Sequence, residues 1–234
     1  EEDKVQSLGM APFSVPDSSF TFVEYYTDEE CTQFVSWPIA WNENDQIIYA
    51  KYIKGDWNII KKAEDVKSSL FMSTKVKDND KYYLIQDIDC TGISVAPFEE
   101  FKGELQGNGF KLSNLKVTLP ASSNRLNNDG KVALFGNISS SAIIENVEWK
   151  DIAVKYTPKN FKDFKCYFLF TSFKLGAIVE NVKISGTFHF ILTLGGVKPS
   201  NIAENWAYDN DTVDDGADIS GFDMSGVSAP TFEE

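Results

Sequence analysis

Two acidic residues separated by one position, Asp87 and Asp89, are the first candidates for chemistry in this sequence. Side chains two positions apart on a strand point to the same side. Two such carboxylates can act as acid and base in glycoside hydrolysis, or they can bind Ca²⁺. The alternative role is structural, because the run DIDCTG (87–92) ends in turn-forming residues whose amide groups would occupy both carboxylates. We favour the structural role.

Glu99 and Glu100 are the next candidates, because they fall beside the same segment. In a turn before Phe101, adjacent acids would point apart and stay solvated. His189, the single histidine, lies near no Ser or Cys motif that would complete a nucleophilic triad. The sequence therefore predicts that the protein is not an enzyme, and it assigns no catalytic, cofactor-binding or metal-ligating residue.

An acidic tail offers the one alternative to the prediction that no cofactor is bound. It contains Asp209, Asp211, Asp214, Asp215 and Asp218. Its spacing differs from that of an EF-hand loop, since Val213 stands where a ligand would fall. Weak Ca²⁺ binding by this tail stays open, beside the favoured interpretation as an exposed capping loop.

Aromatic residues near the N-terminus suggest a second kind of site. The set consists of Trp37, Trp41 and Trp57 with Tyr49 and Tyr52. Exposed aromatic rings could stack on sugars, but aromatic residues of β proteins more often lie in the core, and we favour the core. The three cysteines, Cys31, Cys90 and Cys166, are too scattered for a disulfide framework and are predicted to be apolar thiols.

A repeat organises the middle of the chain. The segment LFGNISSSAIIENVEWK (134–150) aligns without a gap to LFTSFKLGAIVENVKIS (169–185), an offset of 169 − 134 = 35 residues. A period of this length is typical of stacked repeats, and the β-branched content predicts strands. A third echo, KLSNLKV (111–117), would place Asn114, Asn146 and Asn181 in one stack at a single bend.

The other elements define three predicted segments. Residues 1–56 form a small β-rich segment, with strands at 20–26 and 46–53 and a helical turn within 28–36. Residues 57–190 form the repeat body, and one short helix at 62–72 covers its N-terminal end. Residues 191–234 form an acidic C-terminal capping or linker segment.

Charge limits the partners. The chain has 22 Lys+Arg against 35 Asp+Glu, a net charge of −13, and one arginine, Arg125. This balance argues against nucleic acid, and no apolar run is long enough to insert into a membrane. We expect a monomer.

The order of several motifs resembles one family. The motifs are KAED (62–65), YYLIQDIDCTG (82–92), FKGELQGNGFKLSNL (101–115) and ALFG (133–136). Together they resemble the GLUG-type β-helix module of bacterial cell-surface, adhesin-like proteins over about residues 57–190, although Cys90 replaces a leucine and Thr171 a glycine of the family pattern. The resemblance implies an all-β fold, a right-handed parallel β-helix, and an extracellular or cell-surface location.

Three functions follow from this resemblance and from the candidate residues. The leading hypothesis is a non-enzymatic, cell-surface or secreted binding module that recognises a host or matrix protein or a glycan. The first alternative is a polysaccharide lyase or glycoside hydrolase of the β-helix type. The second is a structural spacer domain of a larger surface protein.

Overall fold

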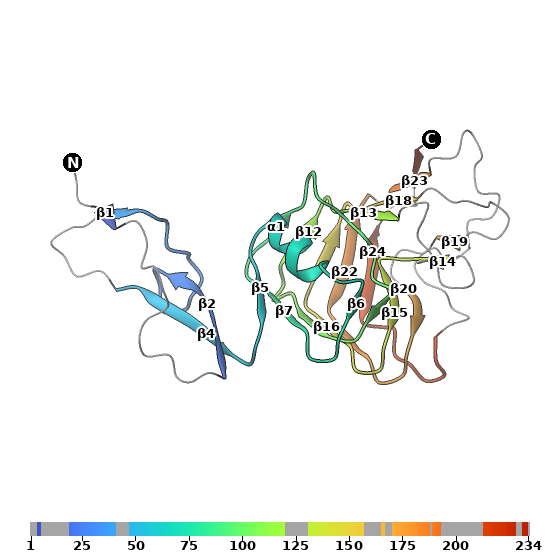
Figure 1. The fold of residues 1–234 in the computed structure, drawn as a ribbon, viewed down its shortest axis with the longest axis horizontal. Coiled ribbons are helices and arrows are strands. Elements are labelled where there is room, and N and C mark those ends of the chain that lie inside the picture. The colour runs from blue at the N-terminus through green and yellow to red at the C-terminus, as the bar shows by residue number, and fades with distance from the viewer. Residues whose placement is uncertain are drawn as a thin grey trace. The chain divides into compact units, whose positions relative to one another are not determined.

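The computed structural model describes the following residues: 4–5, 19–40, 47–119, 131–156, 165–166, 170–187, 189–192, 213–227 and 231–233. The chain divides into two compact units, Glu1–Trp57 and Asn58–Glu234 (Figure 1).

The first unit contains two antiparallel pairs of strands. β2 (Phe20–Tyr26) pairs with β4 (Tyr49–Lys54), and β1 (Lys4–Val5) pairs with β3 (Ile39–Ala40). The predicted strands at 20–26 and 46–53 are confirmed within the described residues. The predicted helical turn within 28–36 is wrong. Turns and bends take its place, because the Asp28 carboxylate accepts hydrogen bonds from the amides of Thr32 and Gln33.

The second unit begins with a strand and a short helix. β5 (Asn58–Ile60) leads into α1 (Ala63–Asp65), which continues as the π-helix η1 (Val66–Leu70). The Asp65 carboxylate accepts the backbone amide of Lys62 at 3.2 Å, which satisfies a donor at the helix start. Val66 and Leu70 are fully buried, so the helix predicted at 62–72 is confirmed, two or fewer residues shorter at each end.

Four parallel sheets make up the rest of the second unit. Sheet I contains β6 (Lys75–Val76), β10 (Glu100–Phe101), β15 (Phe135–Ile138) and β20 (Phe170–Phe173). Sheet II contains β5, β7 (Lys81–Leu84), β11 (Glu104–Gln106), β16 (Ile143–Glu145) and β21 (Ile178–Glu180). Sheet III contains β8 (Ile88–Asp89), β12 (Lys111–Ser113), β17 (Glu148–Lys150), β22 (Val182–Gly186) and β24 (Phe222–Val227). Sheet IV contains β9 (Ser94–Val95), β13 (Lys116–Leu119), β18 (Ala153–Tyr156), β23 (His189–Leu192) and β25 (Thr231–Glu233).

The chain visits these sheets in the constant order I, II, III, IV, and we call each such passage a coil. Coils 1 to 4 begin at β6, β10, β15 and β20, and coil 5 begins with a parallel bridge from Val213 to Phe173. A further parallel pair, β14 (Lys131–Val132) with β19 (Lys165–Cys166), lies outside the four sheets. Parallel pairing therefore continues past residue 190, where the repeat body was predicted to end.

The register follows the repeat. Ile143 pairs with Ile178 and Trp149 with Ile184, both at the predicted offset of 35 residues. The pairing of Phe135 with Phe170 shows that Thr171 does not interrupt sheet I.

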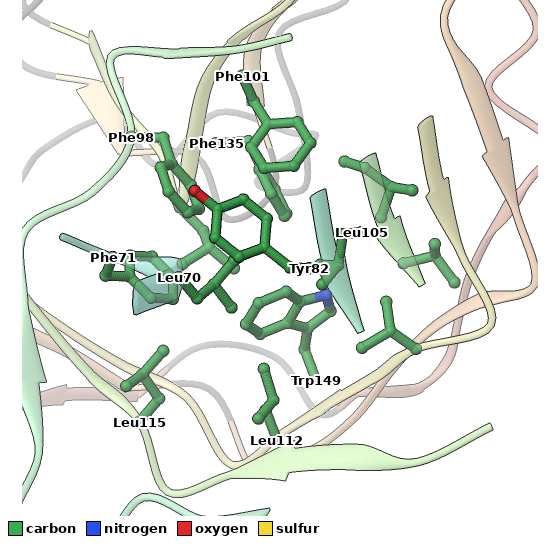
Figure 2. Packing of buried hydrophobic residues seen from close by; sticks show 14 of the residues in the cluster. Leu70, Phe71, Tyr82, Phe98, Phe101, Leu105, Leu112, Leu115, Phe135 and Trp149 are labelled. Atoms are coloured by element: carbon green, nitrogen blue, oxygen red, sulfur yellow. The ribbon is translucent and has the colours of Figure 1, made fainter. Parts of the chain in front are cut away.

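Apolar side chains from equivalent positions of successive coils stack inside the body and form a single buried cluster. Ile144, Val147 and Trp149 point inward, each at most 1 % exposed. Figure 2 shows Trp149 among Leu105, Leu112 and the aromatic rings of Tyr82 and Phe135. Phe71 from the end of the helix stacks on Phe98 at 4.3 Å between ring centroids. The helix therefore covers the N-terminal end of the core.

The fold is β-rich and built mainly from parallel sheets. No helix in the described part of the chain is long and apolar enough to cross a membrane.

Candidate functional site

Asp87 and Asp89 both lie at the surface of sheet III and both bind coil 2. Asp87 accepts hydrogen bonds from the backbone amide of Lys111 at 3.0 Å and from its ammonium group at 2.7 Å. Asp89 accepts the side-chain amide of Asn114 at 2.9 Å and the backbone amide of Thr91 at 3.0 Å. The predicted turn amide is therefore found for Asp89, whereas Asp87 binds the neighbouring strand.

These contacts set the proton affinity of the pair. The hydrogen bond from the Lys111 ammonium lowers the pKa of Asp87 below its ordinary value. Hydrogen bonds from Asn114 and then Thr91 lower the pKa of Asp89. A general acid in glycoside hydrolysis needs the opposite shift, toward the working pH. The arrangement holds both groups as carboxylates with a structural task.

Glu100 begins the strand β10 of sheet I, Glu99 directly precedes it, and neither joins the aspartates at sheet III. Glu99 forms an ion pair with Lys75 at 3.5 Å, and Glu100 forms one with Lys102 at 3.3 Å. Their side chains are 29 % and 34 % exposed, so the prediction that they stay solvated is met in part, with a lysine beside each. The four candidate carboxylates thus lie on two different sheets.

Charges of alternating sign run across sheet III. The column consists, in register, of Asp87, Lys111, Glu148, Lys183 and Asp223. Each member has neighbours of opposite charge on the adjacent coils, which raises the pKa of Lys111 chiefly through Asp87. Such a column stabilises the stacking of coils rather than gathering charge for catalysis.

The predicted asparagine stack is correct for two residues and wrong for the third. Asn181 donates its side-chain amide to Asn146 Oδ1 at 3.0 Å, and Asn146 donates to Gln106 Oε1 at 3.1 Å. We call this row the amide ladder. It lies at the first corner, between sheets II and III. Asn114 is absent from it because it lies at the second corner, between sheets III and IV.

The second corner has its own set of residues. Asn114 is followed there by Asp151 in coil 3 and Gly186 in coil 4, as the pairs Ser113–Lys150 and Lys150–Ser185 require. All three have positive φ angles, of 58°, 52° and 78°. Asn146 and Asn181 at the first corner have the same conformation, with φ of 54° and 52°. Asn, Asp and Gly tolerate this backbone best, which explains why both corners use them.

The remaining single-residue candidates have structural positions. His189 lies on β23 in register with Ala153 and is half-buried. Cys90 is fully buried, and this burial raises the pKa of its thiol to about 12. Cys31 is half-buried, and the side chain of Cys166 lies outside the described residues. Within the described ranges, no three His, Cys, Asp or Glu side chains gather as metal ligands.

The aromatic residues of the first unit are partly packed against one another. Trp37 makes an edge contact with Tyr25 at 6.2 Å, and the indole of Trp57 donates to the carbonyl of Lys54 at 2.8 Å. Tyr52 packs edge-on against Phe22 at 5.6 Å. Trp41 and Arg125 lie outside the described residues. Trp37, Tyr49, Tyr52 and Trp57 are each half-buried and none belongs to the buried core, so the predicted core role is met only in part.

A groove between coils 4 and 5 is the site that sequence reasoning missed. Its volume is about 710 Å³, and it is lined by residues 177–183 of coil 4 and by Asp218, Ser220, Gly221 and Asp223 of coil 5. In coil 5 the chain passes from Val213 to β24 without a strand in sheet II. A signal was present, since GADISGFD (216–223) aligns without a gap to GAIVENVK (176–183). Asp209 and Asp211 of the acidic tail lie outside the described residues, whereas Asp214 pairs with Lys174 at 3.0 Å.

No family model, curated protein or solved structure matches the chain in the three comparisons made.

Proposed function

We propose that the protein is a non-enzymatic binding module whose body is a right-handed parallel β-helix. Four parallel sheets visited in a constant order support this architecture. Right-handed connections between parallel strands are strongly preferred, which supports the handedness. The resemblance of residues 57–190 to surface modules supports an extracellular or cell-surface location and a protein or glycan as partner.

One observation carries the non-enzymatic part of the proposal. The acidic candidates, Asp87 and Asp89, are each bound to coil 2 and have pKa values lowered by those bonds. Catalytic carboxylates in glycosidases must converge across a sugar-binding groove, with one of them protonated near neutral pH. Here both carboxylates serve the stacking of coils 1 and 2.

A turnover assay tests the proposal. The wild-type protein and the Asp87→Asn/Asp89→Asn variant are incubated with a broad panel of acidic and neutral glycans, and new reducing ends and unsaturated products are measured. We expect no turnover from either protein. Activity that the wild type shows and the double variant lacks would replace the binding module with an enzyme.

A further inference from the structure

The groove between coils 4 and 5 lies at the end of a row of outward side chains on sheet II. The row runs, in register, through Tyr83, Gln106, Glu145 and Glu180, so two carboxylates are adjacent at its end. Glu180 has the outward position at the end of the same sheet, on β21, and coil 5 supplies no strand beside it. No described cation forms an ion pair with Glu180 or with Asp218, whose carboxylate binds the amide and hydroxyl of Ser220.

The amide ladder stops at the same place. Asn181 donates to Asn146, but the next position of the ladder is Gly221, which has no side chain. A side chain could not be accommodated there, because a Cβ atom on Gly221 would collide with the carbonyl of Val179. Asn181 Oδ1 receives no donor from the described residues, so the ladder ends in a hydrogen-bond acceptor that borders the groove.

The lining is therefore rich in acceptors and in negative charge. Glu180, Asp218 and Asp223 contribute carboxylates, and Lys183 is the cation that faces them, in register with Asp223. Lysine and arginine side chains carry donors and no acceptors, which matches such a lining. The net charge of −13 would also steer a cationic partner toward the protein.

We propose that this groove binds a basic side chain of a partner protein, so that a Lys or Arg of an extended segment lies between Glu180, Asp218 and Asn181 Oδ1. The basic side chain supplies the positive charge beside Glu180 at the point where coil 5 lacks a strand in sheet II. This inference rests on the proposed binding function and specifies the chemistry of the partner.

The experiment uses the full chain, labelled for NMR, and two peptides blocked at both ends, Gly-Lys-Gly-Lys-Gly and Gly-Glu-Gly-Glu-Gly. We expect the lysine peptide to cause saturable shifts confined to amides of residues 177–183 and 218–223, and the glutamate peptide to cause none. Glu180→Gln should weaken binding about three- to tenfold through loss of a charge-assisted hydrogen bond. Asp218→Asn keeps an acceptor for Ser220 and should also weaken binding of the lysine peptide.

Glu64→Gln is the matched control, because Glu64 is exposed on α1 at the opposite end of the body. It removes the same charge and should change the affinity less than twofold. Equal weakening by Glu64→Gln and Glu180→Gln, shifts scattered over the surface, or no saturation would overturn the proposal. Glucosamine that binds the groove as tightly as the peptide would also overturn it, in favour of an amino-sugar site. Loss of peptide binding leaves the turnover result unaffected, so the two proposals fail separately.

Discussion

The first corner, between sheets II and III, and the second corner, between sheets III and IV, use the same local chemistry but are stabilised differently. At the first corner, the side chains of Asn181, Asn146 and Gln106 bond to one another across three coils. At the second corner, Asn114 bonds to the Asp89 carboxylate, and the Asp151 carboxylate accepts the backbone amide of Thr187 at 2.7 Å. One corner is therefore an uncharged ladder and the other depends on carboxylates. Both corners share a positive φ angle. The residues beside each corner on the adjacent coils determine which hydrogen bonds stabilise it.

The largest expected effect comes from crowding a corner with a methyl group. Gly107 lies at the first corner directly beneath coil 3, and a Cβ atom there would collide with the Asn146 carbonyl and lie 2.5 Å from Val147 Cβ. Because the obstacle includes backbone, Gly107→Ala should lower the free energy of unfolding by about 3 kcal/mol. Denaturant unfolding monitored by fluorescence measures the change.

Gly186→Ala at the second corner is the matched comparison. Its Cβ atom would collide with the Asp151 carboxylate, a side-chain group that can move, while the φ of 78° adds strain. We expect a loss of about 1–2 kcal/mol, chiefly from that strain. Gly109→Ala, with φ of 82° and open space around it, measures the strain alone. A larger loss for Gly186→Ala than for Gly107→Ala would contradict the distinction between the two corners.

Breaking the amide ladder should have the next largest effect. Asn146→Ala removes the partner of both Gln106 and Asn181 and should cost about 1–3 kcal/mol. Asn146→Gly keeps the positive φ angle without strain and isolates the loss of the amide, about 1 kcal/mol. Thermal unfolding of both variants measures the effect. Unchanged stability of Asn146→Ala would show that the ladder contributes nothing.

Lowering the pH should destabilise the second corner but not the first. The pKa of Asp89 is lowered in the folded protein, chiefly by the hydrogen bond from Asn114. The folded state therefore binds this proton less readily than the unfolded state, so the contribution is present above about pH 4 and is lost as the pH falls through the folded pKa. The amide rungs of the first corner do not titrate.

NMR titration of the Asp89 carboxyl carbon, with acid unfolding, measures this difference. We expect Asp89→Asn to make stability less dependent on pH below about 4. Asp215→Asn, an exposed control in coil 5, should leave the dependence as in the wild type. An Asp89 pKa at or above the ordinary value of about 3.9 would contradict the role of Asn114.

The smallest expected effect concerns the charge column on sheet III. Asp87 and Lys111 have side chains that are 54 % and 40 % exposed, so solvent screens their ion pair. Lys111→Met should lower the melting temperature by less than about 2 °C, and the difference should vanish near 1 M salt. Melting curves at low and high salt test this. A large, salt-independent loss would show that packing of the lysine stem, not its charge, supports sheet III.

The sequence by itself determined the pairing of coils 3 and 4 and the backbone of the corners. A gapless repeat fixes the offset of 35 residues, because equal spacing lets every inward side chain lie over its equivalent. Asparagine at 146 and 181 indicated the bend, since few other residues adopt a positive φ angle at low cost. The helix at the N-terminal end was also predictable from its apolar spacing.

Tertiary structure alone decided where Asn114 lies and what the carboxylates bind. Leu105 pairs with Ile144, 39 residues away, whereas Leu112 pairs with Trp149, 37 residues away. Coil 2 therefore has two more residues at the first corner than coil 3. Asn114 lies in register with Asp151 of coil 3, 37 residues away, and not with Asn146, 32 residues away. The motif apolar–x–Asn–apolar is compatible with a backbone bend at the first or at the second corner, so the motif alone does not place Asn114. The alignment of GADISGFD (216–223) with GAIVENVK (176–183) indicates a fifth coil, but not that coil 5 lacks the strand in sheet II on which the groove depends.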